Sequence, residues 1–111
     1  MATRARIGEM TVGQLRERVD MQVPSGTSGE GYATTVADVP ANIRSAGGNE
    51  LLKFGAQVAV NASVITVRYR RDVQPDWRVS WPTENKTFQI VNYGDEAGTK
   101  RWLTVYATEL L

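Results

Sequence analysis

The chain has 111 residues, with thirteen Lys and Arg against twelve Asp and Glu, and it contains neither Cys nor His. A chain of this length is expected to form one domain whose core can fold without metal ions or disulfides. The missing Cys and His exclude disulfides, thiolate catalysis, Cys-based zinc sites and a Ser-His-Asp triad. The net charge of +1 gives no broad positive field of the kind that nucleic-acid-binding proteins carry.

Residues 1–11 are predicted to be a flexible N-terminal arm, because they are short and polar and have no packing face. The arm either stays disordered or becomes ordered on a partner. Arg4 and Arg6 are not followed by the apolar run of a secretory signal. The apolar stretches fall far short of the roughly 20 residues that cross a bilayer. The sequence therefore predicts synthesis in the cytoplasm and no membrane span.

Alternating apolar and polar residues predict six strands, within residues 15–23, 34–43, 63–70, 77–81, 87–93 and 101–107. The third stretch is the clearest because β-branched and aromatic residues dominate it. Its alternation places Ile65, Val67 and Tyr69 on one face and Thr66, Arg68 and Arg70 on the other. Pro40 lies inside the second stretch and cannot donate to a ladder, which predicts a bulge or an edge there. Residues 24–31 are dense in turn formers and predict a mobile hairpin loop.

One short helix is predicted between the second and third strands. Asn49 can cap its first turn, and one helical face carries Leu51, Leu52, Gly55, Val58 and Ala59. The interior glycine makes this helix marginal, since Gly costs about 1 kcal/mol relative to Ala. The fold class is thus mainly β: a small six-stranded antiparallel barrel or sandwich with one short helix in a long inter-strand loop.

Several short motifs follow one another along the chain at spacings typical of a known family. They are Gly13-x-Leu15-Arg16-x-Arg18-Val19-x-Met21-Gln22, Val39-x-Ala41-x-Ile43 leading to Glu50-Leu51, Ile65-x-Val67-Arg68-Tyr69, and Phe88-x-Ile90 before a final apolar strand. This ordered set resembles the phage head-tail joining family, whose members include the stopper or head-closure proteins of long-tailed phages. The resemblance spans residues 12–110.

Two positions depart from the family pattern. Members often place a Trp where this chain has Thr34-Thr35-Val36, and a Gly in the turn where it has Glu84-Asn85-Lys86. Asn85 can adopt the left-handed conformation that Gly would supply, so we expect the turn to keep its shape.

The resemblance implies a structural virion protein that is not an enzyme and binds no cofactor. Residues 12–111 would form a single β-barrel connector domain, part of a dodecameric ring below the portal that retains packaged double-stranded DNA and presents the surface on which the tail docks. Portal or adaptor protein would lie on the head side, and tail terminator or tail tube protein on the tail side. The insertion between the second and third strands would line the channel or touch the neighbouring subunit, through Asn49, Glu50, Lys53, Phe54 and Gln57.

An alternative hypothesis is a small barrel that binds single-stranded nucleic acid. Its candidate residues are Tyr69, Trp77 and Trp81, with Arg68 and Arg70. The alternation favours core positions for the three rings and solvent positions for the arginines.

The remaining charges favour ordinary structural roles. Lys100 and Arg101 lie beside Glu96 in the sequence, which indicates salt bridges or a subunit interface rather than phosphate binding. Asp95 and Glu96 form a single acidic pair in a glycine-bounded loop, which is typical of a solvated turn and gives little support to a metal or acid-base site.

Overall fold

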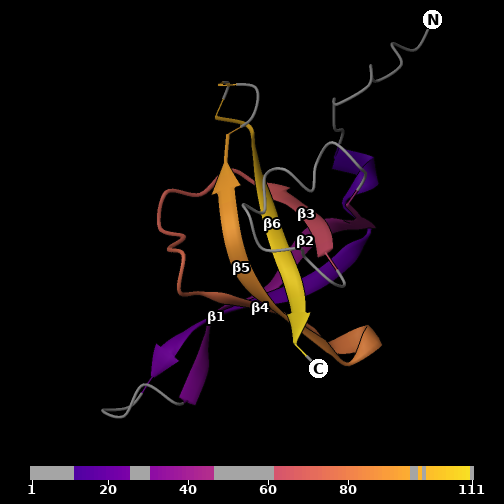
Figure 1. The fold of residues 1–111 in the computed structure, drawn as a ribbon. Coiled ribbons are helices and arrows are strands. Elements are labelled where there is room, and N and C mark those ends of the chain that lie inside the picture. The colour runs from indigo at the N-terminus through magenta and orange to yellow at the C-terminus, as the bar shows by residue number, and fades with distance from the viewer. Residues whose placement is uncertain (1–11, 26–30, 47–61, 96–97, 99, 111) are drawn as a thin grey trace, which may run out of the picture.

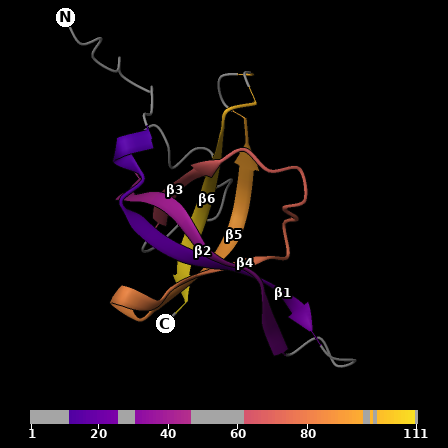
Figure 2. The same cartoon turned by 180° about the vertical axis from the view of Figure 1, so that it is seen from behind.

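The fold is given by a computed structural model, which describes residues 12–25, 31–46, 62–95, 98 and 100–110. Within these residues the chain forms six strands that close into a barrel (Figure 1, and from behind in Figure 2). The strands are β1 (Glu17–Ser25), β2 (Gly31–Ser45), β3 (Ala62–Arg68), β4 (Arg78–Trp81), β5 (Lys86–Gly94) and β6 (Trp102–Leu110). Two short 3-10 turns accompany them, η1 (Val12–Gln14) and η3 (Pro82–Glu84).

The strand order around the barrel is β1-β2-β3-β6-β5-β4, and every neighbouring pair is antiparallel. The barrel closes where Asp20–Gln22 of β1 pair with Arg78–Ser80 of β4. Closure removes the unpaired strand edges that a sandwich would leave. The six predicted strands are thus confirmed, and of the two predicted architectures the barrel is the one formed.

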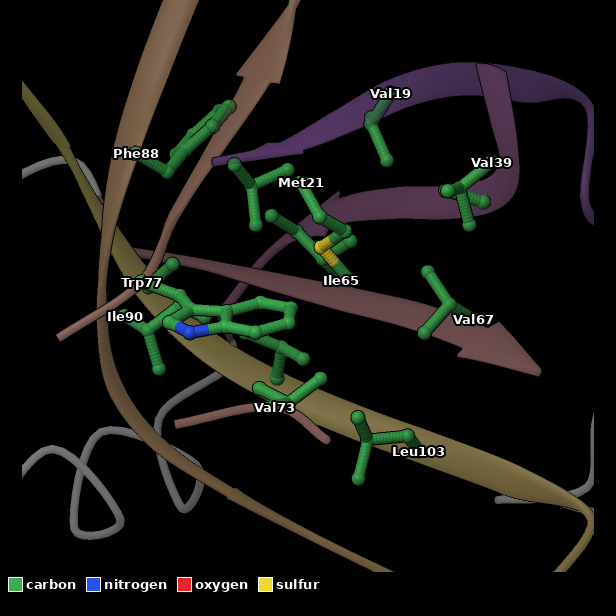
Figure 3. Close-up of a cluster of buried hydrophobic side chains, with 14 residues drawn as sticks. Val19, Met21, Val39, Ile65, Val67, Val73, Trp77, Phe88, Ile90 and Leu103 are labelled. Atoms are coloured by element: carbon green, nitrogen blue, oxygen red, sulfur yellow. The ribbon is translucent and has the colours of Figure 1, made fainter. Parts of the chain in front are cut away.

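Apolar side chains fill the barrel because alternate residues of each strand point inward (Figure 3). Ile65 and Val67 of β3 are fully buried, as their alternation predicted. The other buried residues of this cluster are Val19, Met21, Val39, Ala41, Val73, Trp77, Val79, Phe88, Ile90, Leu103, Val105 and Ala107. Burial of this many apolar side chains is the main source of the barrel's stability.

The outer face of β3 is also covered, which its alternation did not predict. Val64 pairs with Tyr106 of β6, and both are buried in a second apolar cluster that includes Ala46 and Ala62. Thr66 lies on this outer face, opposite to Ile65 as expected, but it is buried rather than exposed to solvent.

The irregular pairing of β2 lies before Pro40 rather than at it. Pro40 pairs in register with Arg18, whereas the register shifts opposite Met21. Asp38 has a φ of 58°, and its N–H donates to Oδ1 of Asp20 over 3.0 Å. Such bulges bend and twist a strand. Beyond the bulges, the end of the β1–β2 hairpin projects away from the barrel (Figures 1 and 2).

The turn after β4 has the shape that the sequence predicted. Pro82 begins η3, where its missing N–H costs nothing. Asn85 has a φ of 54°, in the left-handed region, and its N–H donates to the carbonyl oxygen of Pro82 over 3.0 Å. Asn therefore supplies the conformation that Gly would otherwise provide.

Candidate functional site

The residues proposed from the resemblance lie outside the described residues, as do the predicted helix and the N-terminal arm. These site residues are Asn49, Glu50, Lys53, Phe54 and Gln57. The structure does describe both flanks of their segment. The N–H of Ala46 donates to the carbonyl oxygen of Ala62 over 3.1 Å, next to the β2–β3 pair formed by Ser45 and Ser63. The segment therefore leaves and rejoins the barrel at one point.

Asp95 has a structural role in the turn between β5 and β6. Its Oδ2 accepts the N–H of Lys100 over 2.5 Å, and its carbonyl oxygen accepts the N–H of Gly98 over 3.0 Å. These bonds confirm the predicted turn. Glu96 lies outside the described residues. Within the described part of the chain, no group of three or more acidic residues is placed to hold a metal ion.

The three rings of the nucleic-acid hypothesis occupy different environments. Trp77 is buried in the barrel core, as predicted, and Trp81 is half-buried against the same cluster. Tyr69 does not belong to the core, so its predicted position was wrong. Strand β3 ends at Arg68, and Tyr69 therefore lies beyond the regular alternation that would have turned it inward. The three rings do not form a common surface.

Arg78 is fixed at the base of the projecting hairpin. Its guanidinium carbon lies 3.9 Å from the ring centroid of Tyr32, and its Nε donates to Oε1 of Gln89 over 3.1 Å. The Tyr32 hydroxyl donates to the carbonyl oxygen of Asp76 over 3.1 Å. The cation–π contact ties β2 to β4, and the Tyr32 hydrogen bond ties β2 to the loop before β4. This arginine stabilises the fold.

A hollow of about 340 Å³ lies where β3 ends and β6 begins. These two strand ends lie toward the top of Figure 1. The residues that line it are Arg68, Tyr69, Lys100, Arg101 and Trp102. Strand pairing brings the two sequence segments together: Arg68 pairs with Trp102, and the N–H of Tyr69 donates to the carbonyl oxygen of Arg101 over 3.1 Å. We call this the basic–aromatic hollow.

The described residues that line the basic–aromatic hollow include three cations and no acidic residue. Arg68, Lys100 and Arg101 are exposed, and none forms an ion pair with a described residue. The Arg68 guanidinium lies 6.0 Å from the ring centroid of Trp102. Neighbouring cations that have no counter-ion among the described residues raise the local potential, which favours anionic groups at this end of the barrel.

Arg70, two residues beyond Arg68, differs because it has its own counter-ion. Its Nε and Nη2 donate to the two carboxylate oxygens of Asp72 over 3.0 and 2.7 Å. The hydrogen bond from Arg70 is the main cause that lowers the pKa of Asp72 below its usual value, with a further contribution from the positive charge of Arg70. Arg70 therefore adds little net charge to the hollow.

This pair gives a titration prediction. Since the pKa of Asp72 is lowered on folding, the pair stabilises the protein above the ordinary Asp pKa of about 3.9, and this contribution is lost as the pH falls through the lower folded value. The pair is exposed, so the contribution should be at most about 1 kcal/mol. We expect Arg70→Gln to return the Asp72 pKa toward its ordinary value in a carboxyl NMR titration. An unchanged titration would show that the pair does not persist in solution.

The described part of the chain thus holds its core with apolar residues, and three of its exposed cations lie together at one end of a closed barrel. This arrangement defines a small closed β-barrel with a basic and aromatic surface at one end. No described helix is long and apolar enough to cross a membrane.

The family model described as phage head completion protein matches residues 10–110, and the chain belongs to this family. It is a bacteriophage head completion protein with a β-barrel fold, which gives it a structural task in the virion and other head and tail proteins as its associates.

A solved structure supports the fold. The solution structure of protein SF1141 from Shigella flexneri 2a is similar to the chain with a TM-score of 0.62 and 24% sequence identity, over 90% of this chain and 96% of that one. No curated protein matches the chain.

Proposed function

We propose that the chain is a subunit of the stopper ring that closes the head at the head-tail connector, retains the packaged DNA and presents the docking surface for the tail. The observation that carries this proposal is the match to phage head completion proteins over residues 10–110. The barrel would act by position and association and would catalyse no reaction. The protein would be made in the bacterial cytoplasm and then assembled at the head-tail interface.

The closed barrel is suited to serve as the rigid body of such a ring. Its strands pair with one another all the way around, so the segment at residues 47–61 extends from a framework that does not depend on a neighbour for its pairing. The hydrogen bond between Ala46 and Ala62 holds both ends of that segment. We propose that this segment of each subunit points toward the shared axis of the ring.

Ring symmetry would repeat each contact once in every subunit. We propose that Asn49, Glu50, Lys53, Phe54 and Gln57 face the channel or the adjacent subunit of a dodecamer. Packaged double-stranded DNA would occupy the channel, portal or adaptor protein would contact the ring from the head, and tail terminator or tail tube protein from the tail. Retention would then rest on geometry rather than on the small net charge of one subunit.

Binding of single-stranded nucleic acid through Tyr69, Trp77 and Trp81 is the weaker alternative. Such binding needs exposed rings on which bases can stack. The burial of Trp77 in the core removes the middle ring of that set.

Particles assembled without the chain test the proposed function. In the phage that encodes it, we expect a nonsense allele to give DNA-filled heads that leak their genome and carry no tails, because the connector is left unclosed. Nuclease sensitivity of the packaged DNA and electron microscopy measure the two effects, and supply of the chain from a plasmid is the control. Sealed, tailed particles made without the chain would refute the proposal.

A further inference from the structure

We propose that the basic–aromatic hollow is a docking site for an acidic segment of a neighbouring protein. The identity of that neighbour as a connector protein rests on the proposed function, whereas the chemistry of the site rests on the hollow itself. The segment would present carboxylates to Arg68, Lys100 and Arg101 and an apolar side chain to the rings of Tyr69 and Trp102.

The charge of the hollow selects an anionic occupant. Its three cations have no carboxylate partner among the described residues, in contrast to Arg70, which Asp72 neutralises nearby. A guanidinium over an aromatic ring keeps its N–H groups at the rim free to donate, and their fork geometry matches a carboxylate. Arg68 lies over Trp102 in this way, at 6.0 Å from the ring centroid.

The backbone holds the hollow in place before any partner binds. Arg68 and Trp102 are paired residues of neighbouring strands, and the N–H of Tyr69 bonds to the carbonyl oxygen of Arg101. Lys100 has a φ of 58°, an uncommon conformation for a residue with a side chain, and its N–H is fixed by Asp95. A backbone that is fixed before binding loses less entropy when a partner docks, which favours recognition at this end of the barrel.

The size and composition of the hollow favour a protein segment over DNA. A volume of about 340 Å³ accepts a few side chains and does not admit a duplex. Three cations would neutralise few phosphates, whereas sequence-independent DNA affinity grows with the number neutralised. Arg, Tyr and Trp are the residue types most enriched where protein interfaces concentrate their binding energy, and they make up four of the five described lining residues.

A titration followed by NMR tests the site on the complete chain. The probe is a short Glu-rich peptide with blocked ends and interspersed Leu, added to ¹⁵N-labelled protein. We expect the indole N–H signal of Trp102 to shift and saturate, the signals of Trp77 and Trp81 to stay in place, and the shift to weaken as salt is added. A matching peptide with Gln at every Glu position should leave all three signals unchanged.

Variants localise the effect. Arg101→Gln should weaken peptide binding by about tenfold, the loss expected when a charge-assisted hydrogen bond is removed. Arg18→Gln is the matched control, because Arg18 is also exposed but lies on β1, outside the hollow, and it should bind as the parent chain does. An equal loss in both variants would show general charge attraction and would overturn the proposal.

Nucleic acid and particle assays complete the test. Single-stranded or duplex DNA that shifts the Trp102 signal more strongly than the peptide would overturn the proposal in favour of a nucleic-acid site. The absence of any peptide-induced shift would also overturn the proposed docking site. The proposed stopper function would still stand in that case if heads made without the chain leak their DNA. Conversely, specific peptide binding by a chain that particles do not need would support the hollow and refute the proposed function.

Discussion

Replacing Phe88 with alanine is expected to lower the free energy of unfolding by about 3–5 kcal/mol. Phe88 is 2% exposed and is among the largest fully buried side chains. It lies on β5 between Val79 of β4 and Glu109 of β6, so the change would open a cavity where three strands meet. Small domains are stable by about 5–15 kcal/mol, and a loss of this size would leave the barrel barely folded. Denaturant unfolding followed by tryptophan fluorescence measures it.

Val91 provides the matched control on the same strand. It is one of the few large apolar residues of the described part of the chain that are exposed, at 41%, and it lies at the register shift between Ile90 and Asn92. Truncation of an exposed side chain removes little buried area, so Val91→Ala should change the stability by no more than about 0.5 kcal/mol. Similar losses in the two variants would show that β5 does not pack as described.

The sequence predicted those parts of the fold that depend on local chemistry. The alternation in β3 placed Ile65 and Val67 inward because successive side chains of a strand point to opposite faces. The turn after β4 was predictable because Pro82 and Asn85 each favour the backbone conformation that they adopt. Trp77 was placed in the core by the same alternation that kept Arg78 out of it.

The basic–aromatic hollow was not predictable from the same patterns. Its two halves lie far apart in the sequence, and only the pairing of β3 with β6 sets Arg68 beside Trp102. Tyr69 was assigned to the core because its position continues the alternation, but the strand ends one residue earlier. Strand ends and the pairing of distant strands depend on the whole barrel, so a local period does not determine them.

The outer cluster has the same origin. Thr66 was predicted to lie on the face opposite Ile65 and Val67, and Val64 shares that face by the same alternation. Val64 is buried in a cluster with its cross-strand partner Tyr106, against which Ala46 and Ala62 pack, and Thr66 is buried as well. Cover on the second face of a sheet comes from tertiary contacts that period-two patterning does not contain.

Removal of residues 49–57, bridged by a short Gly-Ser linker, is expected to leave the barrel folded and to abolish plaque formation. The barrel should survive because β2 and β3 pair from Ala41 and Val67 through Ser45 and Ser63, and a shorter connection costs slightly less loop-closure entropy. Function should be lost because the proposed channel and subunit contacts lie within the deleted segment. Far-ultraviolet circular dichroism, thermal unfolding and plaque counts measure the two effects separately.

A chain of unchanged length separates the loss of particular side chains from the shortening of the loop. This variant carries Ser in place of each of the five proposed contact residues, Asn49, Glu50, Lys53, Phe54 and Gln57. If these side chains make the contacts, the Ser variant should fold and still fail to retain DNA in assembled heads, which nuclease sensitivity reports. Normal retention by the Ser variant would refute their assignment. The six described strands close without this segment, so the deletion variant should unfold no more readily than the parent chain. Loss of its strand signal would instead show that the segment contributes to the core.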